Sequence, residues 1–152
     1  MPDIGKMLWP NSLAVVGASS DIHGLRGRIL EILLTHSYEG KIYPVSRSAA
    51  EVQGLKAYPS VDALPEPVDL AILIIPAQYI PTELERCGKA GVKAAVILSS
   101  GFAEEGEAGV RAQADIATIA RRYDMAVSGP NTDRLASEST TSRASTWSIV
   151  MP

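Results

Sequence analysis

The feature that most constrains the fold of this chain is an alternation of short apolar runs with helical patterns. The apolar runs are typical of β-strands and lie at residues 13–17, 41–45, 70–75, 94–100 and 125–129. Apolar side chains recur at helical spacing over residues 24–36, over 81–90 and in a long stretch that ends near 123. Alternating strands and helices form right-handed βαβ units. The sequence therefore predicts an α/β fold: a Rossmann-like, doubly wound, parallel five-stranded sheet in three layers.

The composition agrees with a sheet that helices cover on both faces. Apolar residues make up 46% of the chain and aromatic residues only 5%. Such a core consists mainly of Val, Ile, Leu and Ala, which suit strands buried on both sides. The tail after Asn131 is rich in Ser and Thr and then reads TWSIVMP, like the beginning of another strand. We expect one domain over residues 1–131, followed at 132–152 by a linker or the start of a second domain.

Charge and hydropathy exclude several classes of protein. The net charge of −3 argues against a nucleic-acid binder, which usually carries a basic excess. The N-terminus MPDIGKMLWPNS lacks the apolar core of a signal peptide, and no apolar run approaches the roughly 20 residues that span a bilayer. A single cysteine, Cys87, allows no internal disulfide. We therefore expect a cytoplasmic protein that binds neither nucleic acid nor membrane.

The loop after the first strand has the character of a phosphate-binding loop. Gly17 and Gly24 allow close approach of the backbone, and the following helix begins with unpaired N–H groups and a positive dipole end. The hydroxyls of Ser19 and Ser20 add donors, and Arg26 adds a cation in the first helical turn, where a bound anion would stabilise it. His23 lies in the same loop. We expect this loop to hold a phosphorylated ligand.

Two features argue against NAD as that ligand. The spacing of the glycines departs from the G-x-G-x-x-G pattern of dinucleotide-binding loops. At the end of the second strand, NAD-binding domains place an acidic residue on the ribose hydroxyls. This chain has Ser46, Arg47 and Ser48 there. Those residues suit a ribose that carries a phosphate, as in NADP or in coenzyme A (CoA).

Further candidate residues follow the other strands, and none forms a catalytic set. Pro76 and Ala77 leave the third strand, Ser99 and Ser100 leave the fourth, and Asn131 follows the fifth. His36 is expected to cap the first helix or meet solvent, and Cys87 to be a packed thiol. The acidic residues after the fourth strand, Glu104, Glu105 and Glu107, are typical of a solvated surface. We predict neither a catalytic residue nor a metal site.

Several segments together resemble one family. They are VVGASSD, GKIYPV, EVQGLKAYPSVDALPEPVDLAILIIPA, CGKAGVKAAVILSSGFAEEG and GPN, and they run almost without gaps from Leu8 to Asn131. They are similar to the N-terminal CoA-binding domain of the NDP-forming acyl-CoA synthetases and, more distantly, to the alpha subunit of succinyl-CoA synthetase. The resemblance implies that CoA lies in the crevice, with contacts at His23, Gly24, Leu25, Arg26, Val45, Ser46, Arg47, Ser48, Leu98, Ser99 and Ser100.

The resemblance also implies what lies elsewhere in such enzymes. An acyl phosphate and a phosphohistidine connect thioester cleavage to nucleotide phosphorylation, and the histidine and the ATP-grasp part belong to other domains or subunits. The expected function is therefore the CoA site of an acid–CoA ligase, on a chain that is inactive alone. A stand-alone regulatory module that binds CoA or acyl-CoA is the alternative. An NADP-dependent oxidoreductase is a third, which the lack of a catalytic residue disfavours.

The sequence departs from the family pattern at three ligand loops. The glycine loop often carries a Lys or Arg near position 24, whereas this chain has Gly24 there and Arg26 two residues later. The second strand usually ends in Pro-Val-Asn-Pro-Lys, whereas this chain has Ser46, Arg47 and Ser48 after Pro-Val. After GPN the family usually continues with Cys or Ser and a glycine, whereas Thr132 and Asp133 follow here. We expect these changes to alter the affinity for the ligand and to leave the fold unaffected.

Overall fold

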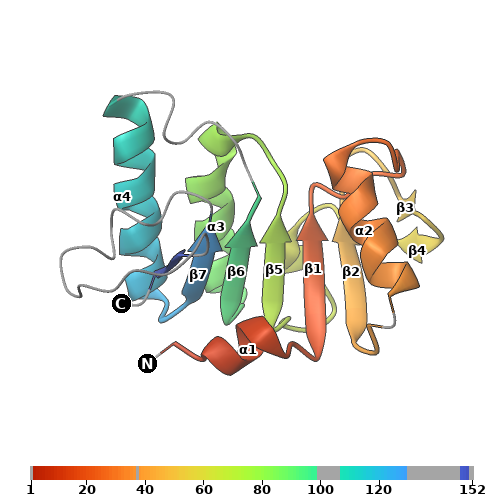
Figure 1. The fold of residues 1–152 in the computed structure, drawn as a ribbon, viewed down its shortest axis with the longest axis horizontal. Helices are drawn as coiled ribbons and strands as arrows, with labels where there is room; N and C mark the ends of the chain where they lie inside the picture. Colours follow the sequence, from red (N-terminus) through yellow and green to blue (C-terminus); the bar gives the residue numbers. More distant parts are fainter. Residues whose placement is uncertain (1, 37, 99–106, 130–147, 151–152) are drawn as a thin grey trace.

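The computed structural model describes residues 2–36, 38–98, 107–129 and 148–150, and the side chains of residues 108, 109 and 148–150 are not described. Its main sheet has six strands in the order β2-β1-β5-β6-β7-β8 (Figure 1). Their bounds are Ser12–Val16 (β1), Lys41–Val45 (β2), Leu70–Leu73 (β5), Ala94–Ile97 (β6), Ala126–Gly129 (β7) and Ser148–Val150 (β8). The five strands from β2 to β7 are parallel, which confirms the predicted sheet.

The predicted strand near the end of the chain is present as β8. It pairs antiparallel with β7, with Ser128 opposite Ile149. This strand therefore extends the same sheet at its edge. The domain boundary after residue 131 stays a prediction, because residues 130–147 lie outside the described residues.

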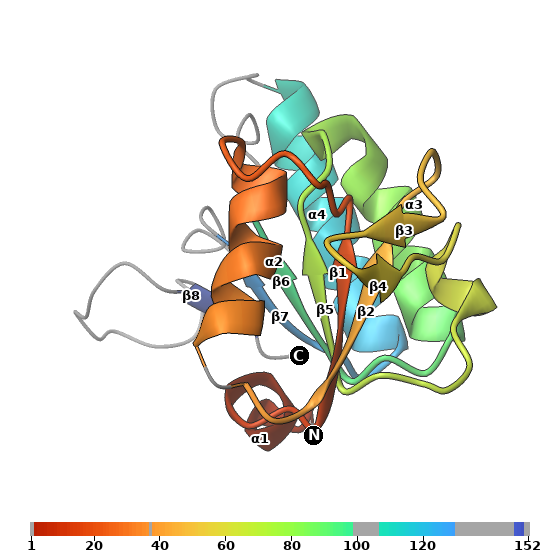
Figure 2. The ribbon, with the colours of Figure 1, turned by 90° about the vertical axis from the view of Figure 1, so that its right-hand side faces the viewer.

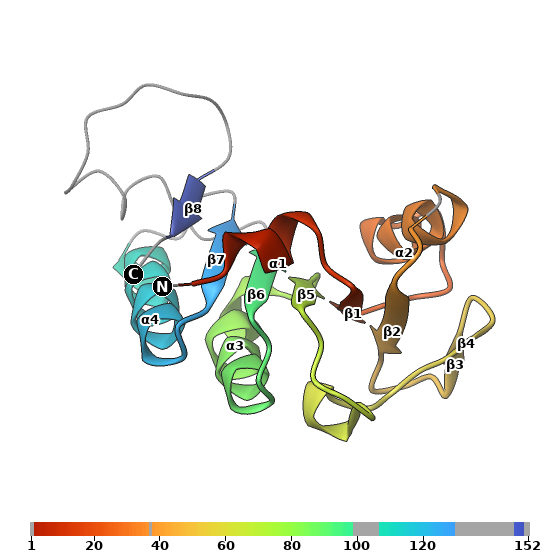
Figure 3. The ribbon, with the colours of Figure 1, turned by 90° about the horizontal axis from the view of Figure 1, so that it is seen from below.

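Helices cover both faces of the sheet, as the three-layer prediction requires. Their bounds are Ile4–Leu8 (α1), Leu25–Thr35 (α2), Ile80–Lys89 (α3) and Glu107–Arg122 (α4). Seen from the β2 edge and from below, α2 lies on one face and α3 with α4 on the other (Figures 2 and 3). No helix in the described ranges is both long enough and apolar enough to cross a membrane.

Alternate residues of each central strand enter different halves of the core. In β1, Leu13 and Val15 pack with Leu30 of α2, whereas Ala14 and Val16 pack with Leu84 of α3 on the opposite face. All of these side chains are almost fully buried. Strands buried on both faces read as continuous apolar runs, which is why they were recognisable in the sequence.

The order of the strands places a topological switch point between β1 and β5. The chain leaves β1 through α2 to reach β2 on one side, and it leaves β5 through α3 to reach β6 on the other. The two helices lie on opposite faces, so the connections diverge from the carboxyl ends of these neighbouring strands (Figure 1). Ligands of doubly wound sheets bind at this place.

Several local features differ from the sequence-based expectations. The helix α1 and a small antiparallel hairpin of β3 (Glu51–Val52) and β4 (Leu55–Lys56) were not predicted. Pro81 is the second residue of α3, not the first. The α1 helix is too short to be stable alone, and Asp69 ties it to the sheet by accepting hydrogen bonds from Lys6 Nζ and Asn11 N (3.3 and 2.9 Å).

Candidate ligand-binding site

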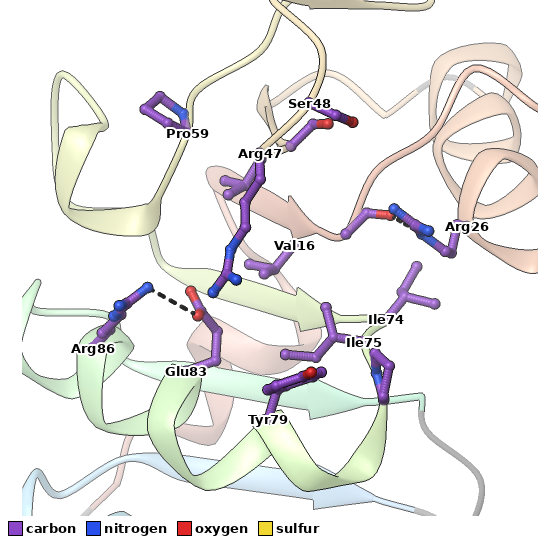
Figure 4. Close-up of a pocket in the computed structure, with 14 residues that line it drawn as sticks. Val16, Arg26, Arg47, Ser48, Pro59, Ile74, Ile75, Tyr79, Glu83 and Arg86 are labelled. Atoms are coloured by element: carbon purple, nitrogen blue, oxygen red, sulfur yellow. Dashed lines mark hydrogen bonds and ion pairs between the residues drawn. The ribbon is translucent and has the colours of Figure 1, made fainter.

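Two neighbouring cavities lie at the switch point and share the wall formed by Arg26, Ile74, Ile75 and Pro76. The α3-side cavity, of about 220 Å³, lies beneath the end of β2 and above α3 (Figure 4). Its other lining residues are Val16, Gly17, Val45, Ser46, Arg47, Ser48, Pro59, Tyr79, Glu83 and Arg86. The α2-side cavity, of about 450 Å³, is also lined by Ser19, Asp21, Gly24, Leu25 and Leu98.

Gly17 forms the backbone turn at the point where the cavities meet. Its φ of +89° is accessible to glycine at no steric cost, and its N–H donates to the carbonyl of Val45 (3.0 Å). The carbonyl of Gly17 accepts a hydrogen bond from Arg26 Nε (2.6 Å). This bond, drawn in Figure 4, holds the side chain of Arg26 at the shared wall, where it lines both cavities.

The loop after Gly17 is folded tightly onto the start of α2. Asp21 N donates to Ser19 Oγ (3.1 Å), and His23 N donates to Asp21 Oδ1 (3.0 Å). A Cβ on Gly27 would clash with the backbone of Asp21, so the loop needs a glycine in this first turn. The first N–H groups of a helix have no intrahelical acceptor, and they carry the positive end of its dipole. The loop therefore presents donors and positive charge to the α2-side cavity.

The α3-side cavity contains an arginine–carboxylate cluster. Glu83 of α3 is only 6% exposed and lies 3.6 Å from the Arg86 guanidinium (Oε2 to Nη1). Arg47, from the loop after β2, points its guanidinium toward the same carboxylate (Figure 4). Burial raises the pKa of Glu83, and the charges of Arg86 and Arg47 oppose that shift. With Arg26, three arginines and one carboxylate line this cavity, which gives it a net positive charge.

The pKa of Glu83 leads to a prediction about stability. Because the folded pKa is raised, the native protein keeps a proton on this carboxyl at pH values where the unfolded chain has lost it. The stability from this group is therefore complete below the ordinary glutamate pKa and is lost as the pH rises through the folded value. We expect the free energy of unfolding of the wild type, minus that of Glu83→Gln, to fall as the pH rises above the ordinary glutamate pKa, in urea titrations without ligand. A difference that rises with pH would contradict the assignment.

The α2-side cavity is the more apolar of the two along its walls. Ile74 is buried, and Ile75, Leu25 and Leu98 add aliphatic surface around Pro76. Polar groups are supplied at one end by Ser19, Asp21 and the backbone of Gly24. Such a space suits a thin, mostly apolar arm that is attached to a charged head.

Most residues that the sequence analysis selected line these cavities. They are Gly17, Ser19, Gly24, Leu25, Arg26, Val45, Ser46, Arg47, Ser48, Pro76 and Leu98. Ser20 and His23 are exposed and line neither cavity, and Ala77 belongs to the short helix η2 (Ala77–Tyr79). Ser99, Ser100 and Asn131 lie outside the described residues. Whether any of these side chains contacts a ligand stays a prediction.

Sequence reasoning missed the contribution of α3 to the site. Tyr79, Glu83 and Arg86 line the α3-side cavity together with Pro59. Tyr79, Glu83 and Arg86 recur at helical spacing near the start of α3, the helix that follows β5. Polar residues in this pattern at a strand end are a signal that could have indicated them.

Cys87 and His36 lie where the sequence analysis expected them: Cys87 is packed in the core, and His36 is at the end of the first long helix. Cys87 is fully buried in the core, and burial raises the pKa of its thiol to about 12, so it is not a reactive thiolate at neutral pH. His36 is exposed at the end of α2, with Nδ1 3.1 Å from the carbonyl oxygen of Ile32.

The fold and the two cavities together define a Rossmann-like domain with a positively charged cleft at its switch point. The CoA-binding domain family matches residues 11–133, and the chain belongs to that family. This result confirms the predicted family and its ligand, coenzyme A.

Two of the proteins to which the chain is similar are acetate–CoA ligases. The chain is 39% identical over 132 residues to acetate–CoA ligase (ADP-forming) II of Archaeoglobus fulgidus, covering 87% of this chain and 20% of that protein. It is 41% identical over 126 residues to acetate–CoA ligase (ADP-forming) I subunit alpha of Pyrococcus furiosus, covering 80% of this chain and 27% of that protein. The chain thus spans about a quarter or less of these relatives.

Solved structures agree in fold. A dinucleotide-forming acetyl-coenzyme A synthetase 1 of Ca. Korarchaeum cryptofilum, in complex with phosphate and ADP, superposes with a TM-score of 0.80 at 40% identity. The match covers 86% of this chain and 28% of that one. A conserved hypothetical protein of Pyrococcus furiosus shares the fold alone, with a TM-score of 0.64 at 24% identity over 97% of its chain.

Proposed function

We propose that this domain supplies the CoA site of an NDP-forming acid–CoA ligase, whose remaining steps take place on domains or subunits outside this chain. The observation that carries the proposal is the division of the cleft into two chemically different cavities that share Arg26. CoA has the matching division. A phosphorylated adenosine is joined through a pyrophosphate to a thin pantetheine arm.

The charges of the two cavities support one orientation of CoA in the proposed site. The α3-side cavity, with Arg47 and Arg86, suits the adenosine and its 3′-phosphate, because guanidinium groups bind phosphate oxygens in pairs. The pyrophosphate then lies at Arg26 and the first turn of α2. The pantetheine arm follows the aliphatic wall of the α2-side cavity toward Leu98, so the thiol leaves the domain past the end of β6.

In this arrangement the domain's contribution to the reaction is binding and orientation. The cavities are lined mainly by arginines, serines and aliphatic residues, together with Tyr79 and two carboxylates, Asp21 and Glu83, and by no histidine or cysteine among the described residues. Holding the thiol in a fixed orientation converts a bimolecular step into an effectively unimolecular one. In the proposed enzyme, the group that carries the phosphoryl and the site that binds the nucleotide come from the other parts.

Calorimetric titration with CoA, dephospho-CoA, NADP and NAD tests this proposal. We expect CoA to bind best and Arg47→Met to weaken CoA by about tenfold or more, as for a lost charged hydrogen bond. Dephospho-CoA, which lacks the 3′-phosphate, should bind Arg47→Met and the wild type about equally. Equal losses for both ligands would remove the assignment of the 3′-phosphate, and a preference for NADP would overturn the proposal.

The alternative is a regulatory module that binds CoA or acyl-CoA and takes part in no ligation. A chain that consists almost wholly of this fold occurs in Pyrococcus furiosus, which shows that the fold is not confined to multidomain chains. The reading frame that follows this sequence in its genome discriminates between the two. A continuation with a phosphohistidine domain supports the ligase, and its absence there and in neighbouring frames supports the module.

A further inference from the structure

The turn of the β3–β4 hairpin breaks a local rule of backbone conformation. Val52 pairs with Leu55, so the turn consists of Gln53 and Gly54 alone, with φ values of +49° and +82°. Two-residue turns with both φ values positive strongly favour Asn-Gly or Asp-Gly. A glutamine in the left-handed region is unfavourable, and an outlier of this kind is a reason to look for a compensating role.

The Gln53 side chain reaches out of the hairpin to the loop before α2. Its Nε2 donates to the carbonyl oxygen of Ser19 (2.9 Å) and to that of Gly27 (2.8 Å). Because both partners are carbonyl oxygens, only the NH₂ end of the amide fits between them. These carbonyls stand at the two ends of the 19–27 loop, so one side chain spans the whole segment.

The hairpin is a rigid support for this contact. Val52 is 1% exposed and packs in the same core cluster as Leu30 of α2. At the base of the hairpin, Tyr58 N donates to the carbonyl of Pro44, and Ser46 N donates to that of Tyr58 (both 2.9 Å). The hairpin is therefore tied to the end of β2, where the Arg47 wall of the α3-side cavity begins.

We infer that Gln53 is a positioning residue for CoA, a role that rests on the proposed function of the cleft. Ser19 and Gly24 of the bridged loop line the α2-side cavity, and Arg26 follows them. The two hydrogen bonds hold the loop and the first turn of α2 in the conformation that presents donors to the pyrophosphate. Through the hairpin, they also connect this loop to the end of β2. The two walls of the cleft are therefore held at a fixed distance from each other.

The variant Gln53→Gly separates this role from a general effect on folding. Glycine removes the side chain and also relieves the unfavourable φ, so the midpoint of urea unfolding is expected to stay close to that of the wild type. CoA affinity is expected to fall about tenfold, because binding must then order the loop. An affinity equal to the wild type, with the fold intact, overturns the inference.

The variant Gln53→Glu gives a readout that a merely structural role would not produce. An ionised carboxylate cannot donate to either carbonyl, whereas the protonated acid can donate to one. The ratio of the variant's Kd for CoA to that of the wild type, measured at each pH, should therefore decrease as the pH falls from about 7 to about 5. The charged and titratable groups on the surrounding elements are the same in both proteins, so the ratio reports the change at residue 53; they are Asp21, His23, Arg26, Arg28, Glu31, Glu51 and Lys56. A ratio that does not change with pH overturns the assigned hydrogen bonds.

Wild-type binding distinguishes failure of this inference from failure of the proposed function. If the wild type does not bind CoA, the proposed function fails, and the inference fails with it. If the wild type binds CoA and both variants bind equally well at every pH, only the role of Gln53 is wrong.

Discussion

Gly17→Ala is expected to abolish CoA binding and to lower the free energy of unfolding by about 2–5 kcal/mol. At a φ of +89° a side chain is strained, and its Cβ would also clash with the carbonyl oxygen of Ile74 and lie 3.1 Å from the carbonyl carbon. Both contacts are with backbone of the segment after β5, so relief requires the tips of β1 and β5 to separate. The switch point that both cavities share would then open. Urea unfolding and calorimetry with CoA measure the two effects.

Gly91→Ala is the matched control for this change. Gly91 has a similar φ of +84°, but its nearest neighbour, Pro67 Cβ, would be at an ordinary distance of 3.7 Å. This residue follows α3 at the opposite ends of the strands, so the variant should lose about 1–2 kcal/mol and bind CoA normally. The difference between the two variants isolates the clash. Equal losses of stability in both variants would show that the strain of a positive φ, without the clash, accounts for the effect of Gly17→Ala.

Arg26→Met is expected to weaken CoA and dephospho-CoA alike, by about 10- to 150-fold, as for one charged hydrogen bond. The guanidinium lies at the wall between the two cavities, where the pyrophosphate is proposed to lie, and both ligands carry that group. The same change removes the bond from Nε to the carbonyl of Gly17, which loosens the turn. Calorimetry with the two ligands gives the comparison.

Arg28→Met removes the same charge two residues further along α2. Arg28 is exposed and, within the described residues, lines neither cavity. Its loss should change both affinities by less than about threefold, since only the long-range field of the protein differs. Similar losses for Arg26→Met and Arg28→Met would mean that general charge, not a placed guanidinium, attracts the ligand.

The regular elements of the sheet were largely predictable from the sequence. Four of the five parallel strands, β1, β5, β6 and β7, were found because they are largely buried on both faces and therefore mostly apolar, whereas β2, at the edge, is buried only over its last two residues. The α1 helix and the β3–β4 hairpin were not found. Their apolar residues are few, and they are held by distant partners, such as Asp69 for α1 and the end of β2 for the hairpin.

The candidate site was predictable wherever its residues follow a strand. Loops after parallel strands meet at one edge of the sheet, so Gly17, Arg26 and Arg47 could be selected without a structure. For Glu83 and Arg86, the helical spacing indicates only that they share one face of a helix near a strand end; which helix lies beneath the β2 loop depends on the order of the strands. Gln53 could not be selected from the sequence, because its partners are 34 and 26 residues away in the chain.

The sequence by itself determined the class of fold, and it predicted both the loops that line the candidate cleft and a ligand with a phosphorylated ribose. These depend on local periodicity and on the chemistry of residues at strand ends. Only the tertiary structure decided that the cleft is divided in two, that a buried carboxylate lies between two arginines, and that a hairpin braces the glycine loop. The physical reason is that these contacts join segments far apart in the chain, and their meeting depends on how strands and helices pack.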